Sequence, residues 1–149
     1  DKAKNRSALV KVIGKVAKTS SMSKTVKPIS RFIDTYLINV ALTDISGLSP
    51  ENLFGLMQAQ WKLAEKRQPR ETLAHVYNPS LKESGWDCDH TVIEIINDDM
   101  PFLVDSVFSK LNRLELTPHL VLHPMFNVLR SKLGKFEGFS FVSSPIHIE

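Results

Sequence analysis

The chain has 149 residues, of which 42% are hydrophobic, and carries a formal net charge of +3 at pH 7. This length and composition suit one ordinary globular domain, or a small domain with an appendage. No run of about 18 apolar residues is present, which excludes a membrane-spanning helix. Cys88 is the single cysteine. It excludes an internal disulfide and a CxxC motif, and it fits a reducing, cytoplasmic environment.

The positive charge is concentrated at the N-terminus. Residues 1–28 hold eight basic side chains against Asp1 alone, a balance of +7, which leaves −4 for residues 29–149. Lysines face away from an apolar stripe with helical spacing, formed by Leu9, Val12, Ile13 and Val16. This pattern predicts a basic amphipathic helix over the first part of the chain, followed by a flexible linker, "TSSMSKTVKP".

A basic amphipathic helix can lie on an anionic membrane, touch nucleic acid, or dock weakly on its own domain. No aromatic residue interleaves the lysines, as a nucleic-acid groove would require. We therefore expect docking on the chain's own domain, with no nucleic-acid and no membrane partner.

Residues 29–70 predict a helical hairpin. The first helix has one apolar stripe, which consists of Ile29, Phe32, Ile33, Tyr36, Leu37 and Val40. Ser49 as N-cap, Pro50 at the first helical position and Glu51 in the first turn predict the start of the second helix. The second helix has an apolar face formed by Leu53, Phe54, Met57, Trp61 and Ala64, and Pro69 is expected to end it.

From residue 71 the hydrophobic period changes to two. "TLAHVY" and "HTVIEII" predict strands, with Ile93 and Ile95 on the opposite face from Glu94. A helix is predicted from 101 to about 114. A long strand is predicted over "TPHLVLHPMFNVLR", with an irregularity at Pro124, and "SKLGKF" predicts a hairpin turn. The order predicts an α+β fold, in which a βαβ-type antiparallel sheet follows a helical hairpin.

The stretch "NDDMPFLVDS" (97–106) forms the corner between the second strand and the following helix. Asp99 can accept hydrogen bonds from the free N–H groups of the helix, and its charge suits the positive end of the helix dipole. Pro101 lacks an N–H group where none is needed. We therefore expect Asp99 to cap the helix. Asp98 and Asp99 do not form an acid–base pair, because adjacent residues of an exposed turn point apart.

Histidines recur on the predicted strands with a two-residue period. His90 and Glu94 share a face, as do His119 and His123, and His147 and Glu149. Such a face could hold zinc. Because the tight spacing of a metal motif is missing, we expect a polar face covered by a partner domain, and no metal site.

The residues of a catalytic dinucleotide site are absent from the sequence. The six glycines are scattered and form neither G-x-G-x-x-G nor a P-loop. We therefore expect no catalytic residues and no cofactor in this chain.

"NDDMPFLVDSVFSKLNRLELTPHLVLHP" resembles the Asp-x-Pro-Gly-x-Leu corner of ACT domains, which are small ligand-sensing modules. "HTVIEIINDDMPFLVDSV", "HLVLHP" and the terminal "IHIE" resemble the N-terminal region of the large bacterial NAD-dependent glutamate dehydrogenases. The resemblance is specific over residues 76–149, extends to the helical layout over 29–70, and is absent over 1–28. It departs at Phe102, where an ACT corner usually has glycine.

The resemblance implies an ACT/ferredoxin-like domain at 71–149, truncated before its last helix and strand, after a hairpin at 29–70 and the basic segment 1–28. The parent enzyme would oxidise L-glutamate to 2-oxoglutarate and ammonium with reduction of NAD, while this fragment would act in regulation and assembly. Its partners would be downstream domains, further copies of the chain and an amino-acid effector. The implied effector residues are Asp98, Asp99, Met100, Pro101, Phe102 and Asp105. The alternative is a stand-alone ACT-type sensor or adaptor.

Overall fold

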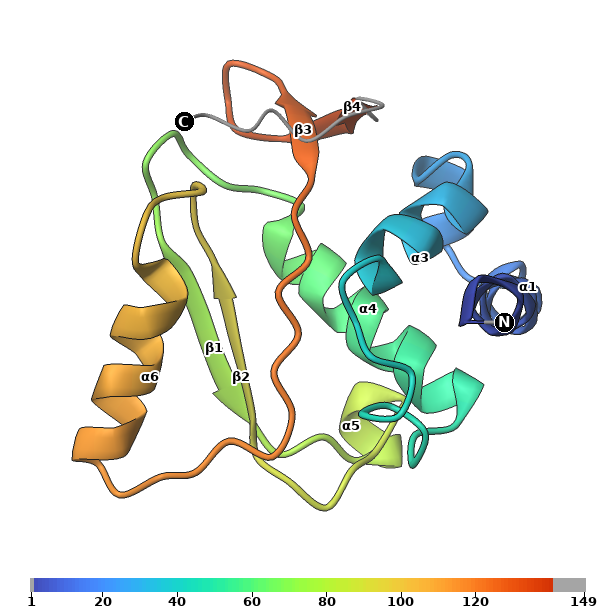
Figure 1. The fold of residues 1–149 in the computed structure, drawn as a ribbon. Coiled ribbons are helices and arrows are strands. Elements are labelled where there is room, and N and C mark those ends of the chain that lie inside the picture. The colour runs from blue at the N-terminus through green and yellow to red at the C-terminus, as the bar shows by residue number, and fades with distance from the viewer. Residues whose placement is uncertain (1, 141–149) are drawn as a thin grey trace.

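The structure, a computed structural model, describes residues 2–140. Ten elements follow one another in the described chain (Figure 1): α1 (Lys2–Ala17), α2 (Met22–Thr25), α3 (Ile29–Leu37), α4 (Pro50–Ala64), β1 (Leu73–Tyr77), α5 (Leu81–Ser84), β2 (Val92–Ile96), α6 (Leu103–Arg113), β3 (Asn127–Arg130) and β4 (Phe136–Ser140). The α+β class is confirmed, with antiparallel pairing of β1 with β2 and of β3 with β4. The strands form two separate two-stranded sheets.

The core lies among α1, α3 and α4. The apolar stripe predicted for α3 is confirmed, since Phe32, Ile33, Tyr36 and Leu37 are all buried. In α4 the Ser49 hydroxyl accepts a hydrogen bond from the Asn52 N–H at 3.1 Å, as the predicted N-cap requires. Helix α4 ends at Ala64, five residues before Pro69.

Helix α1 docks on α3 and α4 through a face that differs from the prediction. Val10, Ile13 and Ala17 are buried, whereas Val12 is exposed, so the docked face is rotated relative to the predicted stripe. The following segment is not the expected flexible linker, because it forms α2 and buries Met22 and Val26. Both segments therefore belong to the helical core, because their apolar side chains complete it.

The β3–β4 hairpin covers the helices and does not extend the β1–β2 sheet. Phe126, just before β3, stacks on Phe32 with ring centroids 4.9 Å apart, and Phe136 meets Trp61 edge-on at 6.1 Å. The long strand predicted over 117–130 is wrong for its first ten residues, which are extended but lie outside any strand. Pro118 and Pro124 lack the N–H groups that a ladder needs.

The β1–β2 sheet lies between α4 on one side and α6 on the other (Figure 1). Helix α6 contains no buried residue, although its sequence is strongly amphipathic. Of the 13 exposed large hydrophobic side chains among residues 2–140, 11 lie between Val76 and Leu133. The C-terminal half of the described chain therefore presents far more apolar surface than the helical half.

Candidate functional site

The corner between β2 and α6 holds all six residues predicted for effector binding. Asp98, Asp99, Met100, Pro101 and Phe102 form the exposed turn, and Asp105 lies exposed in the first turn of α6. Neither of the two cavities described among residues 2–140 is lined by any of the six. The six residues are therefore close neighbours along one turn and outside both of these cavities.

Asp98 has a structural partner that the sequence did not reveal. Its Oδ1 atom accepts a hydrogen bond from Nη1 of Arg67 at 2.8 Å. This hydrogen bond and the positive charge of Arg67 lower the pKa of the Asp98 carboxyl group below its ordinary value. Asp98 therefore fastens the corner to the chain segment that follows α4.

The predicted cap of α6 is wrong. The helix begins at Leu103, and the N-cap position is Phe102, which makes no side-chain capping hydrogen bond. Phe102 has φ = 63° and a 76% exposed side chain. The corner thus keeps the left-handed backbone that glycine would adopt without strain, although a phenylalanine stands there. Asp99 is too far along the turn to serve as the cap, because three residues separate it from Leu103.

Arg67 joins three segments of the chain. Its Nε atom donates to the Glu71 carbonyl at 2.6 Å, and its backbone N–H donates to the Gly134 carbonyl at 3.0 Å. Gly134 has φ = 77°, and a Cβ atom there would lie 2.3 Å from the Arg67 carbonyl oxygen. The turn before β4 therefore needs glycine for its backbone conformation and for this close approach.

The side chain of Arg67 is 9% exposed, and its Nη2 atom has no hydrogen-bond partner among the described residues. A buried cation with an unused donor is costly unless its other contacts are well made. Sequence analysis missed it because Arg67 stands in the charged stretch "EKRQPRE", which suggests a solvated surface. No local signal marks this arginine as buried.

A second polar cluster lies under the β1–β2 sheet, on the face toward α4. Glu94 is 4% exposed, accepts a hydrogen bond from the Tyr77 hydroxyl at 3.0 Å, and lies 3.7 Å from Nδ1 of His75. Burial raises the pKa of the Glu94 carboxyl group, against the lowering effect of Tyr77 and His75. Burial and the nearby Glu94 also raise the pKa of the Tyr77 hydroxyl. Glu94 lies on the opposite face of the sheet from Ile93, as predicted. That polar face was expected to be covered by a partner domain, but here it is turned toward helix α4 of the same chain.

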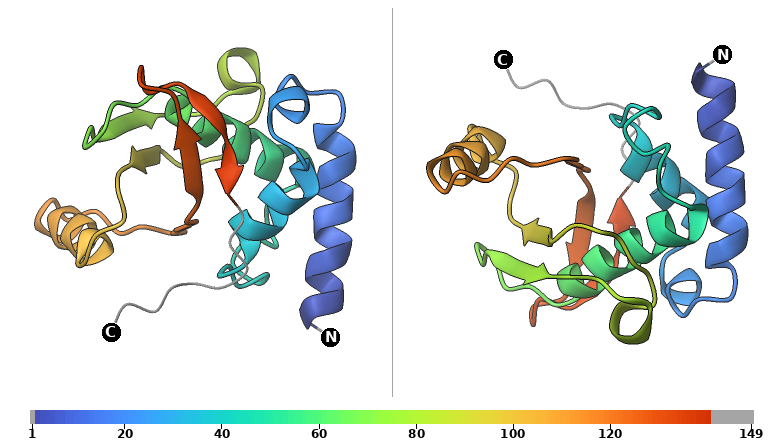
Figure 2. Two further views of the ribbon diagram at one scale, coloured as in Figure 1. Left: turned by 90° about the horizontal axis from the view of Figure 1, so that it is seen from above. Right: turned by 90° about the horizontal axis from the view of Figure 1, so that it is seen from below.

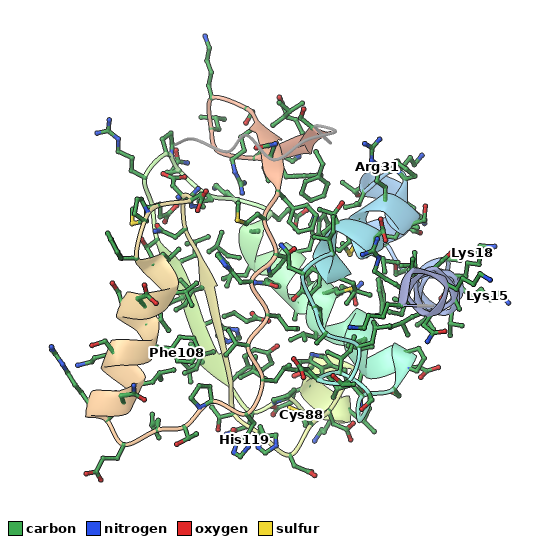
Figure 3. The ribbon with its side chains drawn as sticks, in the orientation of Figure 1. Lys15, Lys18, Arg31, Cys88, Phe108 and His119 are labelled. Atoms are coloured by element: carbon green, nitrogen blue, oxygen red, sulfur yellow. The ribbon has the colours of Figure 1, made fainter. Side chains whose placement is uncertain are left out.

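Only two of the predicted histidine positions meet among the described residues. The rings of His90 and His119 stack with centroids 4.4 Å apart, at the end of the molecule where Figure 3 labels His119 and Cys88. Glu94 has Tyr77 and His75 as its partners instead. No group of three or more metal-ligating side chains occurs within residues 2–140, and His147 and Glu149 lie outside the described residues.

Two features of the structure define the class of protein. Antiparallel strands are combined with α6 in an α+β arrangement, and a tight Asp-Met-Pro corner with a left-handed residue after the proline starts that helix. This is the layout of an ACT-like domain, preceded here by a helical core.

Comparisons with known proteins assign the particular family. Residues 32–147 match the family described as "Glutamate dehydrogenase, ACT1 domain", and the chain belongs to that family. The chain is 32% identical over 117 residues to an NAD-specific glutamate dehydrogenase of Halomonas elongata, and 29% identical over 114 residues to one of Pseudomonas aeruginosa. These alignments cover 78% and 76% of the chain but 7% of each relative. No solved structure matches the chain.

The two aspartates of the corner provide a matched test of the Arg67 contact. Asp98→Ala should lower the free energy of unfolding, because it leaves a second donor of the buried Arg67 without a partner. Asp99→Ala should leave the stability unchanged, because that carboxylate does not cap α6. Chemical denaturation of the purified 149-residue chain measures both. Equal destabilisation by the two variants would show that the corner is held in another way.

Glu94 should give the chain a specific pH dependence. Because the pKa of Glu94 is raised in the folded state, the folded chain tolerates the charged carboxylate less well than the unfolded chain does. The free energy of unfolding therefore falls as the pH rises from about 4.5, the ordinary pKa, through the higher pKa of the folded state. Glu94→Gln removes this titration and still accepts the Tyr77 hydrogen bond. The variant should therefore gain stability relative to wild type between pH 4 and pH 7.

Thermal unfolding of both proteins at the two pH values measures this change, with the exposed Glu83→Gln as control. A stability difference between Glu94→Gln and wild type that stays constant with pH would contradict the buried, titrating carboxyl group.

Proposed function

We propose that this chain works as the N-terminal, non-catalytic regulatory and assembly region of an NAD-dependent glutamate dehydrogenase. The observation that carries the proposal is the family match over residues 32–147. The similar glutamate dehydrogenases are much longer than this chain, which covers 7% of each of them. The reaction of such an enzyme, oxidative deamination of L-glutamate to 2-oxoglutarate and ammonium with reduction of NAD, would belong to other parts of the polypeptide. This chain is expected to bind no NAD itself.

The distribution of apolar surface supports a role in assembly. Side chains such as Val76, 61% exposed, and Ile93, 44% exposed, lie on the β1–β2 sheet, and α6 buries none of its residues. Apolar surface of this extent is typical of a face that another protein surface covers. The partners would be the downstream domains of the same polypeptide and further copies of it, in the cytoplasm. No helix within residues 2–140 has the length and apolar character to cross a bilayer.

An amino-acid effector is the second part of the regulatory proposal. The corner from Asp98 to Phe102 would be its binding site, together with Asp105. The exposed turn leaves Asp99 and the start of α6 accessible, whereas Asp98 is already engaged by Arg67. A stand-alone sensor remains the alternative, and the similarity to long enzymes supports the first proposal over it.

A charge placed on the exposed apolar surface tests the assembly role. Val76→Asp should change the unfolding free energy of the 149-residue chain by less than about 1 kcal/mol, because the side chain is exposed there. In the complete enzyme it should reduce the assembled fraction several-fold, because a buried unpaired charge is costly at an interface. Size-exclusion chromatography with light scattering measures the assembled fraction.

Asn78→Asp is the matched control, since it adds the same charge at an exposed polar position just after β1. It should leave assembly intact. A complete enzyme that carries Val76→Asp and assembles like wild type would contradict the proposed role of this surface.

A further inference from the structure

The β1–β2 sheet leaves the outer edge of β1 without a partner strand among residues 2–140. The sheet consists of these two strands. On its opposite edge, Figure 2 shows the extended residues 117–126 passing on the β2 side, and His119 stacks on His90 just before β2. No backbone hydrogen bond within residues 2–140 reaches β1 from its outer side. A two-stranded sheet is marginally stable by itself, and a free edge tends to recruit a further strand.

The exposure of β1 shows that this edge is accessible. Ala74, His75 and Val76 are all exposed. The strand also lacks the features by which proteins block an edge, because it contains no proline and no lysine and pairs with β2 over five residues without a bulge. We infer that the outer edge of β1 binds β1 of a second copy of this chain, in an antiparallel pair about a two-fold axis.

This pairing deepens the proposed assembly role, on which it rests for its place in the complete enzyme. It names one partner, a second copy, and one edge of the sheet. Two β1–β2 sheets would join into one sheet of four strands in the order β2-β1-β1-β2. The apolar face that holds Val76 and Ile93 would then continue across both copies.

The sequence of β1 is self-complementary about His75. With His75 at the two-fold axis, Leu73 lies opposite Tyr77 of the second copy, and Ala74 lies opposite Val76 of the second copy. Each pair combines apolar or aromatic side chains on one face of the sheet. Cross-strand pairs of this kind stabilise antiparallel strands.

The charges around the edge also fit a second copy. No Lys, Arg, Asp or Glu occurs from 72 to 78, so these residues bring no like charges together along the paired strands. An antiparallel pair brings the segment before β1 of one copy to the same end as the segment after β1 of the other. The first segment holds Arg70 and Glu71. The second holds Lys82 and Glu83, so both segments are neutral and offer charges of both signs.

The first experiment measures the mass of the 149-residue chain by sedimentation equilibrium. The mass should rise from 16.8 kDa toward twice that value between about 1 µM and 1 mM protein, a range that suits a small, reversible interface. Ala74→Lys adds a lysine to the edge and brings two like charges near each other across the axis. It should therefore raise the dissociation constant at least about tenfold.

Ile93→Lys is the matched control. Ile93 is exposed on the same face of the sheet as Ala74, but it lies on β2, one strand away from the edge. Its substitution should change the dissociation constant less than about threefold, because the added charge stays in solvent. Circular dichroism should show both variants folded. Equal weakening by the two variants would show association through the face of the sheet and overturn the edge pairing.

The second experiment tests the register by disulfide formation in a Cys88→Ser background. Directly opposite residues of antiparallel strands lie close enough for a disulfide, whereas diagonal residues at ~7–8 Å do not. Ala74→Cys and Val76→Cys should therefore each give little cross-linked dimer alone. An equimolar mixture of the two should give it readily. Cross-linking in the mixture that does not exceed that of either variant alone would overturn the pairing about His75.

A chain that stays at 16.8 kDa up to about 1 mM also overturns the inference. The proposed function would stand in that case, because Val76→Asp in the complete enzyme reports coverage of the surface by any partner. Conversely, dimerisation through β1 combined with normal assembly of the complete Val76→Asp enzyme would support the edge pairing and contradict the proposed assembly role.

Discussion

The buried guanidinium group of Arg67 is the contact on which the arrangement of the C-terminal half depends. Its Nη1 atom donates to Asp98 at the corner before α6, and its Nε atom donates to the Glu71 carbonyl before β1. The backbone N–H of Arg67 donates to the Gly134 carbonyl in the turn before β4. Arg67 thus holds three segments, two of them through its side chain and the third through its backbone. Because a buried cation is tolerated only with well-made partners, loss of the Asp98 contact should also weaken the contact with the Glu71 carbonyl.

The two halves of the chain are stabilised differently. The helical half buries nearly all of the apolar core, from Val10 to Trp61, and only Phe136 of the C-terminal half joins that buried cluster. The ACT-like half packs Trp86 and the aromatic side chains around β3 and β4 on the helices, has polar contacts at Arg67 and Glu94, and leaves many of its other apolar side chains exposed. A region of this kind suits a role in which the rest of a large enzyme covers the exposed surface, which is the basis of the proposed regulatory and assembly function.

Sequence patterns predicted those features of the fold that depend on residues close together in the chain. The stripe of α3, the Ser49 cap and the positions of β1 and β2 follow from periodicity and capping chemistry, and the corner motif identified the family. Burial of Arg67 was not predictable, because its partners Asp98 and Gly134 are 31 and 67 residues away. The cap at Asp99 failed for a related reason. Asp98 is engaged by the distant Arg67, α6 starts at Leu103, and Phe102 adopts a left-handed conformation that its residue type disfavours.

Amide hydrogen exchange in α6 and in the β1–β2 sheet tests the central claim most directly. The rates are compared between the 149-residue chain and a complete glutamate dehydrogenase polypeptide that contains it. If this region is an assembly module, its exposed apolar surface is covered in the complete enzyme, and exchange in α6 should slow markedly while α3 and α4 change little. Equal exchange rates in α6 in the two proteins would contradict the account.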